Sequence, residues 1–540
     1  MNSLKFSDLP WESHLANSLP ADPETRNFTR TVQEVSYSSV QPTPVRNPQL
    51  LGWSDSLAAE LGISKPTLED RRSVEILGGN LVLPTMKPHA ARYGGHQFGH
   101  WAGQLGDGRA ITLGEALTPG KGRFEYQLKG AGPTPYSRRA DGRAVLRSSV
   151  REFLCSEAMH FLGVPTTRAL SLVTTGDAVV RDMFYDGNAK PEPGAIVCRV
   201  APSFLRFGNF EILASSGEIP LLKKLTDFLI TDHYPELDLR DSDVYGKLLD
   251  EVSRRTAFMI SEWMRVGFVH GVMNTDNMSV LGLTIDYGPY GWLEPYDPNW
   301  TPNTTDAQGR RYRYGNQPSI ALWNLSRLAE ALLPLIQDQA RALASLELYK
   351  TTFQEAYAKT LAKKLGLSSI ESEADQKLVL ELFELLQGSE ADMTLFFRRL
   401  CDWPTGVPAA GPAGEKELEA DFRELIQPTF YTTNFSLPKW VSWFTRYSAR
   451  VRSEVEAQGA GMKPTRSALM KSVNPKYVLR NYLAQNAITA AEKGDPSVLE
   501  RLLRVLRTPY DEMPSEEDLA EKRPDWARDA PGCSALSCSS

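Results

Sequence analysis

The sequence of 540 residues has no excess of positive charge, few cysteines and no long apolar run. Its formal net charge of -6 at pH 7 argues against a nucleic-acid-binding protein, which normally carries a basic excess. Five cysteines are too few for a disulfide framework. No apolar run approaches the roughly 20 residues that span a bilayer, and the first residues lack the apolar core of a secretory signal. We therefore expect a soluble protein that binds neither nucleic acid nor membrane, with the cytoplasm as its default location.

The common nucleotide-binding signatures are missing as well. The glycine-rich stretch 93–113, YGGHQFGHWAGQLGDGRAITL, is neither a P-loop of the form G-x-x-x-x-G-K-[ST] nor a Rossmann G-x-G-x-x-G. Protein kinases read H-R-D followed by four residues and Asn, whereas between His270 and Asn277 this chain has Val272 where the catalytic Asp should stand. The P-loop and Rossmann folds therefore lose support, and the usual kinase base is absent.

The stretch 270–286, HGVMNTDNMSVLGLTID, nevertheless has the residue order of a kinase-like metal site. Asp276 and Asn277 precede a strand-like apolar run, 280–285, and Asp286 then begins a D-x-G step. Two oxygen-bearing side chains on a loop and one Asp at the end of a strand can share a hard cation. In kinase-like folds, such a cation bridges the phosphates of a nucleotide.

A second set of polar residues lies on a predicted strand and the helix after it. Lys129 ends the strand and Glu152 lies on the helix, and a Lys–Glu pair between these elements is the second kinase signature. Four arginines recur at every fourth position, a spacing at which like charges destabilise a helix, so either an anion lies nearby or the face is solvated. These are Arg139, Arg143, Arg147 and Arg151. Beyond the next strand, Arg199 and Arg206 can reach the same anion. The glycines before Arg109 either bring backbone amides to phosphate oxygens or form a tight hairpin.

The periodicity of apolar residues predicts an α+β chain. Strands are expected at 110–113, 124–128, 170–173 and 195–200, and a helix at 144–161. Gly267 should end a second helix just before the metal loop. The expected regions are an N-terminal extension packed on the core (1–80), a β-rich lobe with the nucleotide-binding loop (81–215), a helical lobe with the metal loop (216–405), a flexible break (406–416), a helical extension (417–508) and a loosely held acidic tail with a Cys pair (509–540).

Several long motifs resemble the selenoprotein O family, and the likeness covers most of the chain. They are GQLGDGRA, YQLKGAGPTPYSRRADGRAVLRSSVREF, HGVMNTDN, IDYGP and the terminal Cys-Ser-Ser. The resemblance implies a bilobal, protein-kinase-like fold and a protein nucleotidyltransferase that moves AMP from ATP onto Ser, Thr or Tyr hydroxyls of other proteins. Bacterial relatives are also associated with UMP transfer from UTP. It further implies Mg²⁺ or Mn²⁺, and ATP turned around relative to a kinase, so that the α-phosphate faces the acceptor. We expect a monomer, cytoplasmic in a bacterium and mitochondrial in a eukaryote.

The resemblance also assigns roles to individual residues. Asp276 would be the catalytic base, Glu152 would orient Lys129, and Asn277 and Asp286 would hold the metal. The positions that would bind the nucleotide are Gly106, Gly108, Arg109, Lys129, Asp141, Gly142, Arg199, Arg206 and Asp286.

The chain departs from the family pattern at its C-terminus. Some relatives carry selenocysteine where Cys538 stands, often in a Cys-x-x pair, whereas here four residues separate Cys533 from Cys538. A short tail lets the two sulfurs approach, so a redox disulfide between them is predicted under oxidising conditions.

Two alternatives to nucleotidyl transfer stay open. The first is a kinase-type phosphotransferase with a relocated base, which is disfavoured because Val272 cannot accept a proton. The second is a non-catalytic, pseudokinase-like nucleotide-binding scaffold, which is disfavoured because both metal ligands, Asn277 and Asp286, are present.

Overall fold

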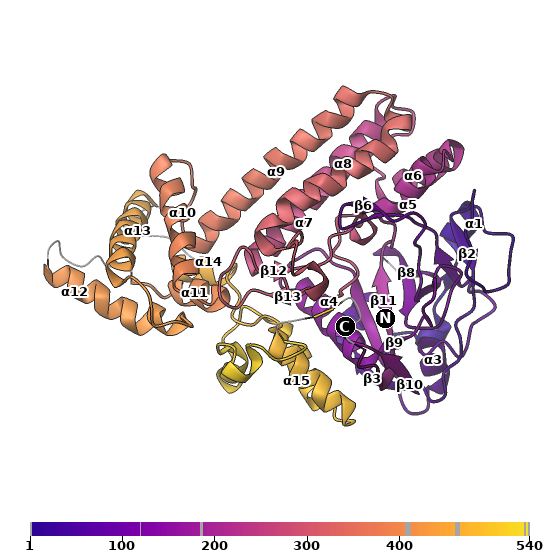
Figure 1. Ribbon diagram of the computed structural model, residues 1–540, viewed down its shortest axis with the longest axis horizontal. Coiled ribbons are helices and arrows are strands. Elements are labelled where there is room, and N and C mark those ends of the chain that lie inside the picture. Colours follow the sequence, from indigo (N-terminus) through magenta and orange to yellow (C-terminus); the bar gives the residue numbers. More distant parts are fainter. Residues whose placement is uncertain are drawn as a thin grey trace.

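The computed structural model describes residues 3–118, 120–183, 187–404, 412–458, 465–533 and 536–537, and it has an α+β architecture. Figure 1 shows a sheet-rich half formed by the first part of the chain and a helical half formed by most of the rest. The predicted α+β class is therefore confirmed. Two hydrophobic cores support these halves, one on each face of the large sheet.

A nine-stranded sheet in the order β2-β4-β7-β8-β11-β10-β3, with β1 on β7 and β9 on β11, organises the first half. Every pair in it is antiparallel. All strands of the described chain are β1 (Trp11–Glu12), β2 (Tyr37–Ser39), β3 (Gln49–Trp53), β4 (His89–Ala91), β5 (His96–Gln97), β6 (His100–Trp101), β7 (Ala110–Thr118), β8 (Gly122–Lys129), β9 (Ala144–Val145), β10 (Arg168–Arg181), β11 (Lys190–Ala201), β12 (Phe268–Val269) and β13 (Gly291–Trp292).

The four predicted strands are present as parts of β7, β8, β10 and β11, and each is longer than expected. The first 80 residues do more than wrap the core, because they contribute β1, β2 and β3 to the sheet. Along β8 the side chains alternate between the two faces. Tyr126 and Leu128 belong to the core on one face, which leaves Glu125, Gln127 and Lys129 on the other.

Helices form most of the second half, and helices pack on both faces of the sheet. They are α1 (His14–Ser18), α2 (Asp55–Leu61), α3 (Arg71–Leu77), α4 (Leu146–Phe161), α5 (Phe207–Ser215), α6 (Ile219–His233), α7 (Val244–Val266), α8 (Gln317–Ile336), α9 (Gln339–Leu365), α10 (Glu373–Gly388), α11 (Met393–Leu400), α12 (Pro412–Asp421), α13 (Leu437–Gln458), α14 (Arg466–Lys471), α15 (Asn481–Glu492) and α16 (Ser497–Leu506). In Figure 1 the long helices α7, α8 and α9 run side by side.

Two predicted helix positions agree with the structure. The helix expected at 144–161 is α4, which begins two residues later than expected because residues 144 and 145 form β9. Gly267 ends α7 in the left-handed conformation, with φ 74°, which glycine adopts without a steric penalty. The segment Tyr314–Ile336, which contains α8, is apolar and long enough to cross a membrane, but it packs against α5, α7 and α9 as a core helix does.

The strand expected at 280–285 is wrong. Gly282 has φ 66° and makes a turn in the middle of the run, so the segment pairs only through isolated bridges such as Met278 with Thr284. Asp286 therefore follows a turn-rich loop. The break expected at 406–416 falls largely outside the described residues, and α12 begins at Pro412.

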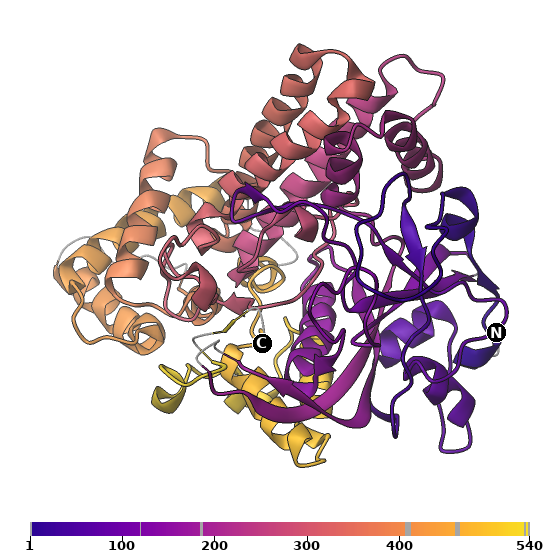
Figure 2. The ribbon, with the colours of Figure 1, turned by 45° about the vertical axis from the view of Figure 1, so that its right-hand side comes forward.

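The acidic tail is not loosely held, contrary to expectation. Glu512 lies 2.6 Å from Arg398 and 2.7 Å from Lys476, and these ion pairs fix the start of the tail. Further on, the backbone N–H of Leu536 donates to the carbonyl of Pro302 at 2.9 Å. Figures 1 and 2 show the yellow helix α15, which precedes this tail, beside the sheet-rich half and not at the tip of the helical one, in agreement with its contacts to α4.

Candidate active site

A buried cluster of three cations and two carboxylates lies where β8, β11, α4 and the metal loop meet. We call it the phosphate cluster, and it consists of Lys129, Glu152, Arg199, Arg206 and Asp286. The Lys129 Nζ atom lies 2.6 Å from Glu152 Oε2, so the predicted strand–helix pair is formed. A guanidinium nitrogen of Arg199 lies 3.3 Å from the other carboxylate oxygen of Glu152 and also donates to Asp286. Glu152 thereby orients both cations.

Asp286 receives hydrogen bonds from both Arg199 and Arg206, one on each carboxylate oxygen. Burial alone would raise the pKa of this carboxyl, but the nearby guanidinium groups and the Lys129 ammonium hold its pKa well below the usual range. Asp286 has φ 57°, a left-handed conformation that Asp tolerates better than most residues. It is therefore a permanently charged group at the centre of the cluster.

The residues present fit a hard divalent cation. The Asn277 side chain donates to the carbonyl of Val272 at 2.9 Å, and in the described part of the chain its Oδ1 atom accepts no hydrogen bond. A carboxylate has about four lone-pair positions, so Asp286 can bind a cation while it keeps both arginines. One amide oxygen and one carboxylate form the small donor set that Mg²⁺ uses when phosphates and water supply its other ligands.

Asp276 has a very different environment from Asp286. Its side chain is buried, Gln97 donates to Oδ2 at 3.2 Å, and Oδ1 has no hydrogen-bond partner among the described residues. Burial raises the pKa of Asp276 to about 7. The hairpin β5–β6 covers this carboxyl, because a Cβ atom on Gly95 would lie 2.8 Å from Oδ1. A carboxyl with a pKa close to neutrality can both accept and release a proton near pH 7.

The glycine-rich turn is held against the loop that follows β8. Gly106 has φ 100°, and a Cβ atom there would lie 2.4 Å from the ring of Tyr136. The hydroxyl of Thr134 donates to the carbonyl of Asp107 at 2.6 Å, and that of Ser137 donates to the carbonyl of Gly108. The tight-hairpin and phosphate-contact interpretations are compatible here, since the clamped turn leads directly into β7, whose first residue, Ala110, pairs with Lys129.

Two other predicted nucleotide ligands, Asp141 and Gly142, contact residues outside the phosphate cluster. Asp141 is exposed and lies 2.6 Å from Arg181, a partner that the sequence did not indicate. Gly142 is buried, and a Cβ atom there would overlap the carbonyl of Gly132 at 2.1 Å. Arg109 has no ion-pair partner in the described chain, but it is close enough to Lys129 to contribute, after burial, to lowering the pKa of that ammonium.

The arginines spaced by four do not gather round the anion site. Arg147 pairs with Glu192 at 2.9 Å, and Arg151 is buried with its guanidinium 4.2 Å above the ring of Tyr290. Arg143 donates to the carbonyl of Thr43 at 3.1 Å. Neither a shared anion nor a solvated face describes this row, because its members reach different partners.

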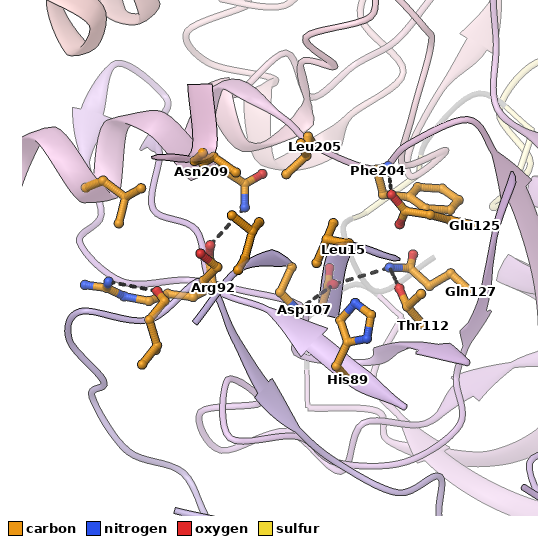
Figure 3. Close-up of a pocket in the computed structure, with 16 residues that line it drawn as sticks. Leu15, His89, Arg92, Asp107, Thr112, Glu125, Gln127, Phe204, Leu205 and Asn209 are labelled. Atoms are coloured by element: carbon orange, nitrogen blue, oxygen red, sulfur yellow. Dashed lines mark hydrogen bonds between the residues drawn. The ribbon is translucent and has the colours of Figure 1, made fainter. Parts of the chain in front are cut away.

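Further along the same face of β8, beyond Lys129, the space is nearly closed. Figure 3 shows residues that line a cavity between the sheet and α5, among them Gln127, which donates to Thr112 and to Asp107, the latter at 3.2 Å. The cavity volume is about 20 Å³. Such a volume holds about one water molecule. Burial, together with the neighbouring Glu115, raises the pKa of Glu125 to about 8. We call the polar residues here the back cluster, and they are Asp107, Glu115, Glu125 and Gln127.

The sequence pattern missed two residues that complete the site. Gln127 accepts a hydrogen bond from Arg199 and so links the phosphate cluster to the back cluster. Gln97 is the partner of Asp276. The alternation of polar residues in FEYQLK could have shown that Gln127 shares a face with Lys129. No comparable signal marked Gln97, which lies on a short hairpin.

Cys533 is buried and carries a free thiol, and burial raises its pKa to about 11. Cys538 lies outside the described residues, so the disulfide between the two stays a prediction. A protonated, buried thiol is a weak nucleophile.

Comparison with known proteins agrees with this geometry. The family model described as "Protein adenylyltransferase SelO" matches residues 24–507. A "Protein nucleotidyltransferase YdiU" from Nitrosospira multiformis is 59% identical, with 99% of this chain and 97% of the relative covered. Proteins of the same name from Xanthomonas campestris and Rhodopirellula baltica are 54% and 53% identical, with 99% of this chain covered and 100% and 99% of the relatives. This chain therefore belongs to the SelO family and is an enzyme of the protein nucleotidyltransferase class.

Proposed function

We propose that the enzyme transfers AMP from ATP, in the presence of Mg²⁺ or Mn²⁺, to a Ser, Thr or Tyr hydroxyl of a protein, with the nucleotide inverted relative to a kinase. The observation that carries the proposal is the closed back cluster. When ATP binds as it does in a kinase, the adenine ring needs room between the lysine-bearing strand and the connection to the helical half. The 20 Å³ cavity there is far below the about 300–1,000 Å³ of ordinary ligand pockets.

Because that side is closed, the adenine ring lies on the side of the glycine-rich turn. The α-phosphate then lies next to the metal loop. The acceptor oxygen then attacks the α-phosphorus, the bond from this phosphorus to the bridging oxygen breaks, and pyrophosphate leaves. Asp276 takes the hydroxyl proton, which its pKa near 7 allows at neutral pH. Val272, at the kinase base position, is apolar and buried.

The charge of the leaving pyrophosphate is matched by Lys129, Arg199 and Arg206, which are fixed in advance by Glu152 and Asp286. Pre-oriented cations in a buried site stabilise developing charge without reorganising during the reaction. A divalent cation bound by Asn277 and Asp286 would neutralise phosphate charge further. UTP is the alternative donor.

The test uses ATP labelled at either the α- or the γ-phosphate. We expect α-label on protein and no γ-label. Asp276→Asn should lower the α-label by about 10²–10⁴-fold, the usual contribution of a general base, while nucleotide binding persists. The exposed Asp511→Asn variant is the control and should label normally. Transfer of γ-label alone would identify a phosphotransferase with a relocated base and refute the proposal.

The location and the oligomeric state stay predictions of the sequence. We propose a monomer in the cytoplasm of a bacterial cell, which size-exclusion chromatography and cell fractionation would check.

A further inference from the structure

A loop with three arginines borders the metal loop and has no role in the site described above. We call residues 309–314, with the sequence GRRYRY, the arginine loop. Tyr312 and Tyr314 are fully buried, whereas Arg311 and Arg313 alternate with them and are partly exposed. The alternation fixes the tyrosines in the core and turns the two arginines outward.

The arginine loop is tied to the metal loop by specific hydrogen bonds. The hydroxyl of Tyr312 donates to Asn274 Oδ1 at 2.5 Å and accepts from the backbone N–H of Phe98 at 2.9 Å. The buried carboxylate of Asp306 accepts from the backbone N–H groups of Arg311 and Tyr312, at 2.9 and 2.7 Å. The position of Arg311 relative to the site is therefore set by the fold.

Arg311 forms no close ion pair in the described part of the chain, although its charge acts on the buried carboxyl of Asp306. In the part of the chain that the structure describes, no carboxylate oxygen lies within 4.0 Å of Arg310, Arg311 or Arg313, and the Nε atom of Arg311 is buried without a hydrogen bond. The guanidinium of Arg311 is held instead by stacking, 4.7 Å above the ring of Trp323. An arginine that is oriented by an aromatic ring keeps its planar donor fork free for a carboxylate.

One hairpin contacts both the Arg311 guanidinium and the proposed base, Asp276. Gln97 donates to Asp276, and Gly99, two residues further along the same hairpin, would place a Cβ atom 3.4 Å from the guanidinium of Arg311. Two residues span at most about 7 Å. The same hairpin carries Trp101, which is 39% exposed and contacts His96 at 5.1 Å between ring centroids. The hairpin that contacts Asp276 thus also carries a partly exposed aromatic ring and lies against a guanidinium.

We propose that Arg311 is a specificity-determining residue that docks the acceptor protein by binding an Asp or Glu side chain within about three residues of the modified hydroxyl. The inference rests on the proposed function. The nucleotide's phosphates are already matched by Lys129, Arg199 and Arg206, which leaves the charge of Arg311 for the other substrate. Arg327, the nearest arginine on α8, is paired with Glu330 at 2.7 Å and is not available.

The test uses pairs of synthetic peptides with a central Ser, Thr or Tyr that differ only by Glu or Gln at one flanking position, together with α-labelled ATP. The wild-type enzyme should favour the Glu peptide of the best pair by about tenfold or more in kcat/KM, since a charge-assisted pair is worth more than a neutral contact. Arg311→Gln should bring this ratio close to one by raising the KM for the Glu peptide, with the KM for ATP and the rate on the Gln peptide unchanged. Arg311→Lys should restore part of the preference.

The matched control is Arg72→Gln, an exposed arginine on α3, which should keep the wild-type ratio. An unchanged ratio in Arg311→Gln overturns the inference alone. A raised KM for ATP in Arg311→Gln shows that the arginine contacts nucleotide and also overturns it. A wild-type enzyme that transfers α-label to no peptide and no protein refutes the proposed function itself. Thermal unfolding of each variant confirms that it is folded.

Discussion

The phosphate cluster and the back cluster are linked by the hydrogen bond from Arg199 to Gln127, and they accommodate buried carboxyl groups in opposite ways. Both hold carboxyl groups inside the protein, where an unpaired charge is expensive. In the phosphate cluster, cations outnumber carboxylates and the pKa of Asp286 is held well below its usual range. In the back cluster, carboxyls outnumber cations, and burial raises the pKa of Asp107 as well as that of Glu125, the latter to about 8.

The difference assigns the two clusters different tasks. A site with surplus cations can accept an anion together with a metal ion, because adding negative charge completes its neutralisation. In the back cluster Glu125, with a pKa of about 8, is neutral at pH 7, and the remaining space holds about one water molecule. The back cluster therefore closes one side of the cleft by packing, and the phosphate cluster is the side that we propose to bind the nucleotide.

Removing the charge of Asp286 should have the largest effect on transfer activity. Asp286→Asn leaves Arg199 and Arg206 without their shared counter-ion and removes the anionic metal ligand. We expect transfer to fall by about 10³-fold or more, since a metal ion supplies several kcal/mol of charge stabilisation. The free energy of unfolding should also fall, by about 3–5 kcal/mol, because a buried ion pair is broken. Labelling assays and urea denaturation measure both. Near-normal turnover by the folded variant would show that Asp286 is not a metal ligand.

A smaller effect is expected at the glycine-rich turn. Gly106→Ala places a methyl group into the ring of Tyr136 at a backbone conformation that disfavours side chains. Overpacking of this kind costs about 1–3 kcal/mol, so we expect the KM for ATP to rise by about tenfold. Gly103→Ala is the matched control, since Gly103 also has a positive φ, 72°, but a Cβ atom there meets nothing within 4 Å. Equal KM values for the two variants would show that the turn does not position the nucleotide.

The smallest effect on transfer is expected in the back cluster, where a substitution should change only how stability depends on pH. The folded-state pKa of Glu125 is about 8 and its usual value is 4.5, so the folded protein binds this proton more tightly than the unfolded chain. The resulting stability is fully present below pH 4.5 and is lost as pH rises through 8, by up to about 1.4 kcal/mol per pH unit.

Glu125→Gln should remove this dependence, so that the variant matches the wild type near pH 5 and exceeds it near pH 9, with normal transfer activity. Urea denaturation at several pH values gives the comparison. Parallel stability profiles for the two proteins would mean that Glu125 is ionised in the fold and that the contrast between the clusters is wrong.

Much of the local structure could be predicted from the sequence, because its determinants are local. The spacing of apolar residues indicated four strands of the large sheet and the helix that carries Glu152. Gly267 marked the end of α7, since only a residue that tolerates a left-handed conformation fits there. The order of Lys129, Glu152, Asn277 and Asp286 indicated a phosphate and metal site before any contact was known.

Only the tertiary structure decided which of these residues meet and with what charge. Arg199 and Asp286 are 87 residues apart in sequence, and Arg206 and Asp286 are 80 apart, so no local pattern singled them out from the arginines spaced by four. The protonation of Asp276 and Glu125 depends on how deeply distant segments bury them, and burial is a property of the packed chain. The sequence by itself determined the elements and the kinds of group they carry, whereas long-range packing determined the partners and the pKa values, because desolvation and pairing exist only once separate segments come together.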